Sequence, residues 1–233
     1  MRNVLLAGIA ATVLTAAGPA AAATRNYGVS GFDRVRVDGP FKVKLVTGHA
    51  PFARANGSSI ELDGLAIDVQ GRTLVVHSSQ SKWVTSASAG GGPITVEIGT
   101  HDLTSAILNG AGTLAIDKVR GLTFGLTIVG SGAVAIAQAD VDKLDVAVSG
   151  TSNASISGRA KQMTAIVRGI STLDAAALTV KDATIGVDGA ATVAAQVTNA
   201  VKVSGSGPGN VTLTGRPACT LKVVGSGSVS GCK

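Results

Sequence analysis

Apolar residues alternate with polar or small ones along most of the chain beyond residue 100, and the alternation recurs around regularly spaced glycines. The glycines align as Gly110, Gly130, Gly150, Gly169, Gly189, Gly205 and Gly225, with successive spacings of 20, 20, 19, 20, 16 and 20 residues. The residues four and two positions before each glycine are all apolar, and so are those four and six positions after each of the first five. Strict two-residue alternation is typical of a strand with one buried face.

Each repeat is therefore predicted to be a strand, a glycine turn, a second strand and a longer return loop. A fixed period near 20 residues indicates a solenoid, because one unit cannot bury its own apolar face and must stack on its neighbours. The fold class predicted is all-β, a single-stranded parallel β-helix or β-solenoid. A β-sandwich of short strands is the alternative, although a sandwich does not require a common spacing.

The segment from residue 24 to 100 has a less regular pattern. Strands are expected over 32–37, 41–46, 60–65, 67–69, 74–76 and 94–98. We interpret this segment as wider opening coils of the same solenoid, with a mobile, glycine-rich loop over 78–93. Residues 101–233 are expected to form the regular repeat coils, ending in a C-terminal disulfide cap.

The N-terminus has the pattern of a secretory signal peptide over residues 1–23. Arg2 precedes an apolar run from Val4 to Ala17, and small residues from Ala20 to Ala23 supply a cleavage site. An uncleaved N-terminal anchor is the alternative. No later stretch is long and apolar enough to be a transmembrane helix. The protein is therefore expected to be exported, to the periplasm or the cell surface of a Gram-negative bacterium.

Cysteine usage and charge fit an exported protein. The two cysteines are Cys219 and Cys232, and an oxidising compartment favours a disulfide between them, with free thiols or half of a metal site as alternatives. The formal charge of +6 is spread along the chain. This allows attraction to lipopolysaccharide or acidic glycans, but the basic cluster with interleaved aromatics of a nucleic-acid binder is missing.

The sequence shows none of the residue patterns that are typical of a catalytic site. His49, His77 and His101 are isolated in the sequence, and the Gly-x-Gly turns lack the third glycine and the helix of a dinucleotide fingerprint. We therefore assign no catalytic, cofactor-binding or metal-binding residue, and predict that the protein is not an enzyme.

Two weaker candidates remain for ligand contact. Asp140, Asp142 and Asp145 lie close together and are interpreted as a solvated acidic loop, with a weak calcium site as the alternative. Trp83, beside Lys82, is the lone tryptophan; packing over the coil edge is the favoured interpretation, and stacking on a sugar is the alternative that makes both residues candidates for ligand contact.

The opening segment also resembles a known family. The sequence FDRVRVDGPFKVKL over 32–45, GRTLVV over 71–76 and ITVEI over 94–98, leading into Gly-Ser-Gly repeats, is similar to the auto-transporter adhesin head GIN domain family. The resemblance covers essentially the whole mature chain and implies an exported β-solenoid. It departs from the family pattern where several repeats lack the second glycine.

Three hypotheses about function follow. The first is a binding or adhesion module for a glycan, lipopolysaccharide or surface partner. The second is a structural envelope protein that self-associates as a homo-oligomer. The third and weakest is a glycan-cleaving β-helix enzyme.

Overall fold

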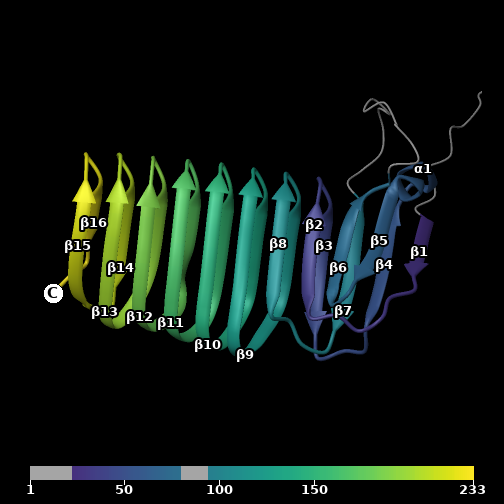
Figure 1. Ribbon diagram of the computed structural model, residues 1–233, viewed down its shortest axis with the longest axis horizontal. Helices are drawn as coiled ribbons and strands as arrows, with labels where there is room; N and C mark the ends of the chain where they lie inside the picture. Colours follow the sequence, from purple (N-terminus) through teal and green to yellow (C-terminus); the bar gives the residue numbers. More distant parts are fainter. Residues whose placement is uncertain (1–22, 80–93) are drawn as a thin grey trace, which may run out of the picture.

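The computed structural model describes residues 23–79 and 94–233. In this part of the chain sixteen strands form one continuous sheet that winds into a β-solenoid, with one short helix at the N-terminal end (Figure 1). The elements are β1 (Ala23–Tyr27), β2 (Arg34–Asp38), β3 (Lys42–Thr47), β4 (Phe52–Gly57), α1 (Ser59–Asp63), β5 (Leu65–Gln70), β6 (Thr73–Ser78), β7 (Thr95–Thr100), β8 (Ser105–Gly110), β9 (Thr113–Gly130), β10 (Ala133–Gly150), β11 (Asn153–Gly169), β12 (Thr172–Asp188), β13 (Thr192–Ser206), β14 (Asn210–Thr214), β15 (Ala218–Val224) and β16 (Ser228–Ser230). The expected signal peptide over 1–23 lies outside the described residues except for Ala23, and so does most of the expected loop over 78–93.

The regular coils confirm the predicted solenoid. Strands β9 to β13 each run almost once around the coil, and each pairs in parallel with the next. The return segments are bent strand rather than the loops expected from the sequence. Residues 118–121 of β9, for example, pair in register with residues 138–141 of β10. Stacking on the next coil satisfies the backbone groups of this segment, so no irregular loop is needed.

Glycines stack at the tight corner of each coil from the β2–β3 corner to the β15–β16 corner. Gly130 has φ of +120°, and a Cβ there would lie 2.7 Å from the carbonyl oxygen of Gly110 in the preceding coil. Residues with a Cβ reach such a φ poorly, and the stacked backbone leaves no room for one. The corner glycines are Gly39, Gly110, Gly130, Gly150, Gly169, Gly189, Gly207 and Gly225.

The sequence alignment was wrong at one of these corners. Gly205 pairs with Val187 within the strands, and Gly207 is the residue stacked on Gly189. The last two repeats, from Gly189 to Gly207 and from Gly207 to Gly225, are therefore 18 residues long. With Gly207 at the corner, Val211 falls four positions after it, as the equivalent residues do in the earlier coils.

Two serines replace the second corner glycine without breaking the stack. Ser152 and Ser171 are buried at the position that Gly132 holds in an earlier coil. The hydroxyl of Ser152 donates to the carbonyl oxygen of Gly130 at 2.9 Å, and that of Ser171 donates to the carbonyl oxygen of Gly150 at 3.0 Å. Each hydroxyl thus binds the preceding corner, which explains why the Gly-x-Gly sequence is not kept in every repeat.

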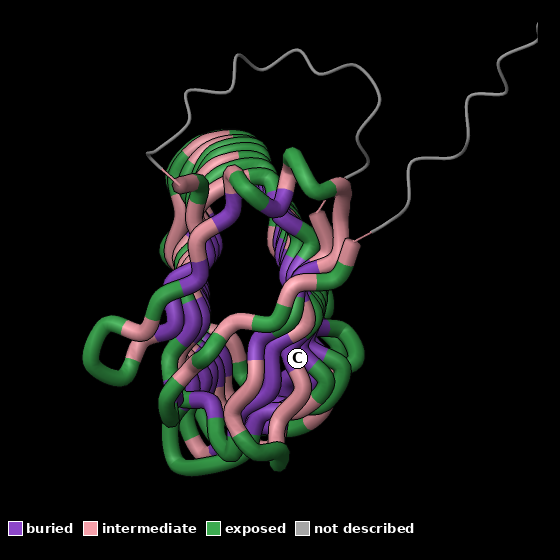
Figure 2. Tube along the Cα trace, turned by 90° about the vertical axis from the view of Figure 1, so that its right-hand side faces the viewer, coloured by how far each residue is buried: buried purple, intermediate pink, exposed green. Residues whose placement is uncertain are grey.

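The core consists of rows of small aliphatic side chains between the two walls of the coil. Figure 2, which looks along the long axis, shows the buried segments on both walls. One row contains Leu114, Val134, Ala154, Leu173, Val193 and Val211, and the facing wall contributes Ala106, Leu126, Val146, Ala165, Ile185 and Val203. The predicted alternation is confirmed. Inward-facing residues at the same position in successive coils form continuous ladders of apolar contacts.

The N-terminal segment continues both walls but adds antiparallel pairs. β2 and β3 extend the parallel stack onto β8 and β9, whereas the β1–β4, β4–β7 and β5–β6 pairs are antiparallel. The strand expected over 60–65 was wrong, because residues 59–63 form α1. Ser58 and Glu61 form a capping box at its start, and Leu62 is buried against the end of the core.

Candidate functional site

The acidic residues of the return bends are paired with basic residues. The Nε and Nη2 groups of Arg159 donate to the two oxygens of the Asp140 carboxylate, at 2.7 and 2.8 Å, and these hydrogen bonds hold the pKa of Asp140 below its ordinary value. Lys161 lies 2.8 Å from Asp142, and Lys143 pairs with Asp145. Within residues 23–79 and 94–233, no group of three or more His, Cys, Asp or Glu side chains is placed to hold a metal ion.

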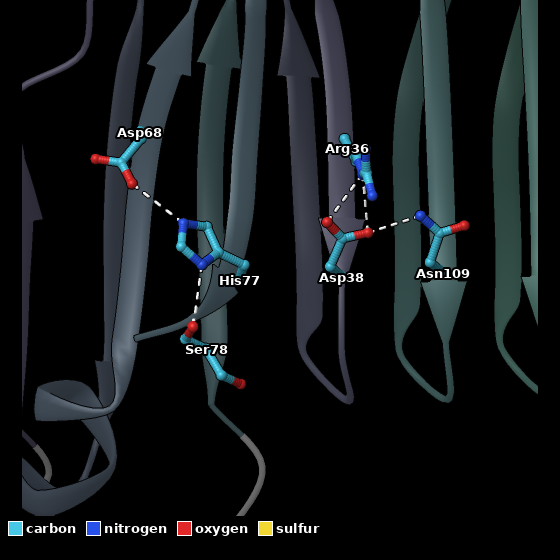
Figure 3. A network of polar contacts seen from close by, with 6 residues as sticks. All are labelled: Arg36, Asp38, Asp68, His77, Ser78 and Asn109. Atoms are coloured by element: carbon cyan, nitrogen blue, oxygen red, sulfur yellow. Dashed lines mark hydrogen bonds and ion pairs between the residues drawn. The ribbon is translucent and has the colours of Figure 1, made fainter. Parts of the chain in front are cut away.

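Polar contacts also join the outer faces of the N-terminal strands. Asp38 accepts from Arg36 on its own strand and from the Asn109 amide on β8, at 2.6 Å (Figure 3). Nearby, His77 lies 3.1 Å from Asp68 across the β5–β6 pair and 3.0 Å from the Ser78 carbonyl oxygen. The contact with Asp68 connects two neighbouring strands, so His77 has a structural role.

One outer face of the solenoid, which we call the flank, is smooth and almost uncharged. It is formed by two rows of outward-facing residues on the first half of each coil. The rows are Lys42, Thr113, Ala133, Asn153, Thr172, Thr192, Asn210 and Ser228, and Lys44, Ala115, Ala135, Ser155, Asp174, Ala194, Thr212 and Ser230. The flank is therefore a regular array of methyl, hydroxyl and amide groups, interrupted by Lys42 and Lys44 on β3 and by Asp174 on β12, and Glu97 of β7 lies in register beside Lys44.

The flank is hollowed where the small residues are densest. Two adjoining open depressions, of about 380 and 310 Å³, share Ala115, Ala135 and Ser155 as lining residues. Lys44 lines one end of the first depression, and Asp174 lines the second. Because neighbouring strands lie about 4.8 Å apart, the trough from β3 to β12 extends about 19 Å across the coils. We call these two depressions the flank trough.

The C-terminal end of the solenoid is open. Leu221 and Val223 pair with the inward-facing residues Val203 and Gly205, yet they are 49% and 37% exposed, because no further coil covers them among the described residues. Within the same part of the chain, β15 pairs only with β13 and β16 only with β14. This end therefore presents two free strand edges beside exposed core residues.

The residues singled out from the sequence have different outcomes. The disulfide between Cys219 and Cys232 is confirmed and closes a separation of 13 residues at the open end. Trp83 and Lys82 lie outside the described residues. The repeat pattern places small residues such as Ala115, Ala135 and Ser155 at outward-facing positions and suggests a smooth flank suited to lateral association or a flat ligand, but it does not predict the hollowing that forms the trough. The signal of these residues is weak because small residues at exposed positions occur for many reasons.

The geometry agrees with a family comparison. The model of the family described as "Putative auto-transporter adhesin, head GIN domain" matches residues 31–217. The chain belongs to this family. The match extends from just before β2 to the bend before β15, and it includes the corner glycines from Gly39 to Gly207 and the flank rows as far as Asn210 and Thr212. No match was found among curated proteins.

Solved structures of other proteins share the fold. A "putative adhesin" from Bacteroides fragilis superposes with a TM-score of 0.77 at 16% identity, covering 90% of this chain and 95% of the other. A "putative lipid binding protein" from Parabacteroides distasonis superposes with a TM-score of 0.73 at 17% identity, covering 91% and 97% of the two chains.

Within residues 23–79 and 94–233, no helix has the length and apolar character to span a membrane.

Proposed function

We propose that this GIN-domain protein is an exported, non-enzymatic binding module of the adhesin type, which recognises a glycan or lipopolysaccharide through the flank trough. Its location is the periplasm or the cell surface of a Gram-negative bacterium. Membership of a family described as adhesins and the signal-peptide pattern of residues 1–23 support this proposal. One relative of similar fold is described as lipid binding, which supports an amphiphile of the envelope as a partner.

The flank trough is the single observation that carries this proposal. Its floor of alanine methyl groups accepts the apolar face of a sugar ring or an acyl chain, while Ser155 and Asn153 supply groups that both donate and accept hydrogen bonds. An open surface that repeats from coil to coil fits an elongated ligand with its own repeat. Lys42 and Lys44 at one end favour an anionic ligand.

The test fills the trough with a side chain. Ala135→Tyr places an aromatic ring on its floor, and Ala147→Tyr is the matched control because Ala147 faces outward on the opposite wall of the same strand, β10. Binding of purified protein to immobilised polygalacturonate, dextran and lipopolysaccharide is measured by surface plasmon resonance. We expect one of the anionic surfaces to bind wild type and Ala147→Tyr alike, and to lose at least tenfold in affinity for Ala135→Tyr. Equal binding by the three proteins contradicts the proposal.

A second function, self-association in the envelope, is favoured by the open C-terminal end. Free strand edges beside exposed apolar residues are templates for pairing with another chain. Light scattering of the mature protein tests this: a stable oligomer that Leu221→Lys converts to a monomer supports assembly through this end. A monomer at every concentration excludes it.

A further inference from the structure

A second hollow lies where the N-terminal segment meets the first regular coil. Its volume is about 540 Å³, within the usual range for small-molecule sites. Four separate segments form it: the residues before β2, the turn between β5 and β6, the connection from β7 to β8, and the return bend of β9. Its polar lining residues are Asp33, Arg72, His101, Asp102, Thr104 and Arg120.

A missing side chain in the first coil opens this hollow. Gly121 pairs in register with Val141, which pairs with Ala160 and in turn with Val180. Those three residues are buried in the later coils, whereas Gly121 is exposed, and a Cβ built on it meets no atom within 4 Å. The coil thus leaves space at one place that later coils fill with aliphatic side chains.

The hollow has one fixed ion pair. Asp33 is only 9% exposed, and its Oδ2 accepts hydrogen bonds from the Arg72 guanidinium and, at 3.3 Å, from the Thr104 hydroxyl. The backbone of Asp33 is held as well, since its carbonyl oxygen accepts from the Thr104 amide at 2.8 Å. Because the Arg72 side chain is 74% exposed, its remaining N–H groups are available to a ligand from a fixed position.

Three further polar side chains in the hollow are unused. Within the described residues, the side chains of His101, Asp102 and Arg120 make no hydrogen bond or ion pair, in contrast to the paired acids of the later return bends. Arg120 has only donors, ionised Asp102 has only acceptors, and His101 has both. A simple anion would meet the Asp102 carboxylate, and a neutral sugar would make no use of the charge on Arg120, which is within electrostatic reach of Asp140 but does not pair with it.

We propose that this hollow binds an acidic sugar unit, whose carboxylate pairs with Arg120 while its hydroxyl groups donate to Asp102. Guanidinium groups bind carboxylates through two parallel hydrogen bonds, which gives both strength and orientation. The choice of a saccharide rests on the proposed function, but the site is separate from the flank trough. The trough reaches Asp117, three residues before Arg120 in the same return bend, so the two sites adjoin along β9.

The experiment is calorimetric titration of the full mature protein with trigalacturonate, with maltotriose as the neutral probe and inorganic phosphate as the simple anion. The variants are Arg120→Gln, Asp102→Asn and the control Arg216→Gln, which changes an exposed arginine in the last coil. We expect wild type and Arg216→Gln to bind trigalacturonate alike. Arg120→Gln and Asp102→Asn should each weaken binding by at least tenfold, and neither maltotriose nor phosphate should match the wild-type affinity for trigalacturonate.

Several outcomes overturn the proposal. They are absence of trigalacturonate binding at millimolar concentration, equal binding by Arg120→Gln, or binding of maltotriose or phosphate as tight as that of trigalacturonate. The Ala135→Tyr variant separates this failure from that of the proposed function. If it abolishes binding to polygalacturonate surfaces while trigalacturonate fails to bind, the trough is the glycan site and the hollow is not. If Arg120→Gln alone abolishes both, the hollow is the site and the trough is not.

Discussion

Stacked corner glycines should make the solenoid sensitive to a single added methyl group. In Gly130→Ala, the new Cβ would lie 2.7 Å from the Gly110 carbonyl oxygen and 3.1 Å from its nitrogen and Cα. All three contacts are with backbone, which cannot move aside without shifting the neighbouring corner. Gly121→Ala is the matched control, because Gly121 has a similar φ of +136° but open space around its Cβ position.

The two variants differ in the terms that contribute to the free energy of unfolding. Both adopt a positive φ that costs an L-residue about 1–2 kcal/mol, partly offset by about 0.4–1 kcal/mol because alanine restricts the unfolded chain. Gly130→Ala also forces the stacked backbone apart, a strain of about 1–3 kcal/mol for overpacking a tight site. We expect a loss of about 1 kcal/mol for Gly121→Ala and about 2–4 kcal/mol for Gly130→Ala.

Urea unfolding followed by circular dichroism measures both losses, with the slope of the transition checked for two-state behaviour. Hydrogen exchange gives a second readout. Strain at Gly130 should lower the protection of amides in β9 and β10 and leave the protection of the N-terminal segment unchanged. Equal losses for the two variants, or a loss below 1 kcal/mol for Gly130→Ala, would refute the stacked-corner account.

Three other predictions concern the corners, the return bends and the open end. Replacing both Cys219 and Cys232 by serine should lower stability by about 3 kcal/mol, because the disulfide closes a separation of 13 residues, and hydrogen exchange should show the loss first in β15 and β16. Ser152→Ala removes a hydrogen bond to the preceding corner and should cost about 1 kcal/mol in urea unfolding; no change would mean that the bond does not stabilise the corner. Arg159→Gln should raise the pKa of Asp140 in a carboxyl NMR titration. Because the folded-state pKa is depressed, the stabilisation is present above the unfolded-state pKa and disappears as the pH falls through the folded one, so wild type and variant should differ at neutral pH and converge in acid.

The repeat predicted the solenoid because one physical requirement, a side-chain-free corner, recurs at a fixed spacing. The error at Gly205 shows the limit of this signal. In the sequence GSGPG over 205–209, two overlapping Gly-x-Gly pairs exist, and only the pairing with Gly189 selects Gly207. A register between strands is a property of the stack, which one repeat taken by itself does not specify.

Local competition explains the error at α1. The apolar residues Ile60, Leu62 and Leu65 suggest a strand, but Ser58 and Glu61 have the spacing of a capping box, which favours a helix start. The strands β1 and β4 were also not predicted. The inward-facing residues Ala53 and Ala55 of β4 are too small to stand out as an apolar pattern.

The sequence did not predict the hollow for a different reason. The hollow brings Asp33, Arg72, His101 and Arg120 together from positions far apart in the chain, and only the junction between the N-terminal segment and the first coil makes them neighbours. The isolation of His101 in the sequence suggested a loop residue without a role. Its environment depends on the antiparallel strand pairs of the N-terminal segment, which the sequence pattern did not predict.

The most direct test of the proposed binding face is a methyl NMR titration. The mature protein is labelled at alanine methyl groups and titrated with the anionic polymer that it binds most tightly in the surface measurements. The flank carries Ala115, Ala133 and Ala135, whereas Ala147 faces outward on the opposite wall. If the flank trough is the binding face, we expect methyl chemical-shift changes at the three flank alanines and none at Ala147. Shifts confined to Ala147 and its neighbours, or none on the flank at saturation, would contradict this proposal.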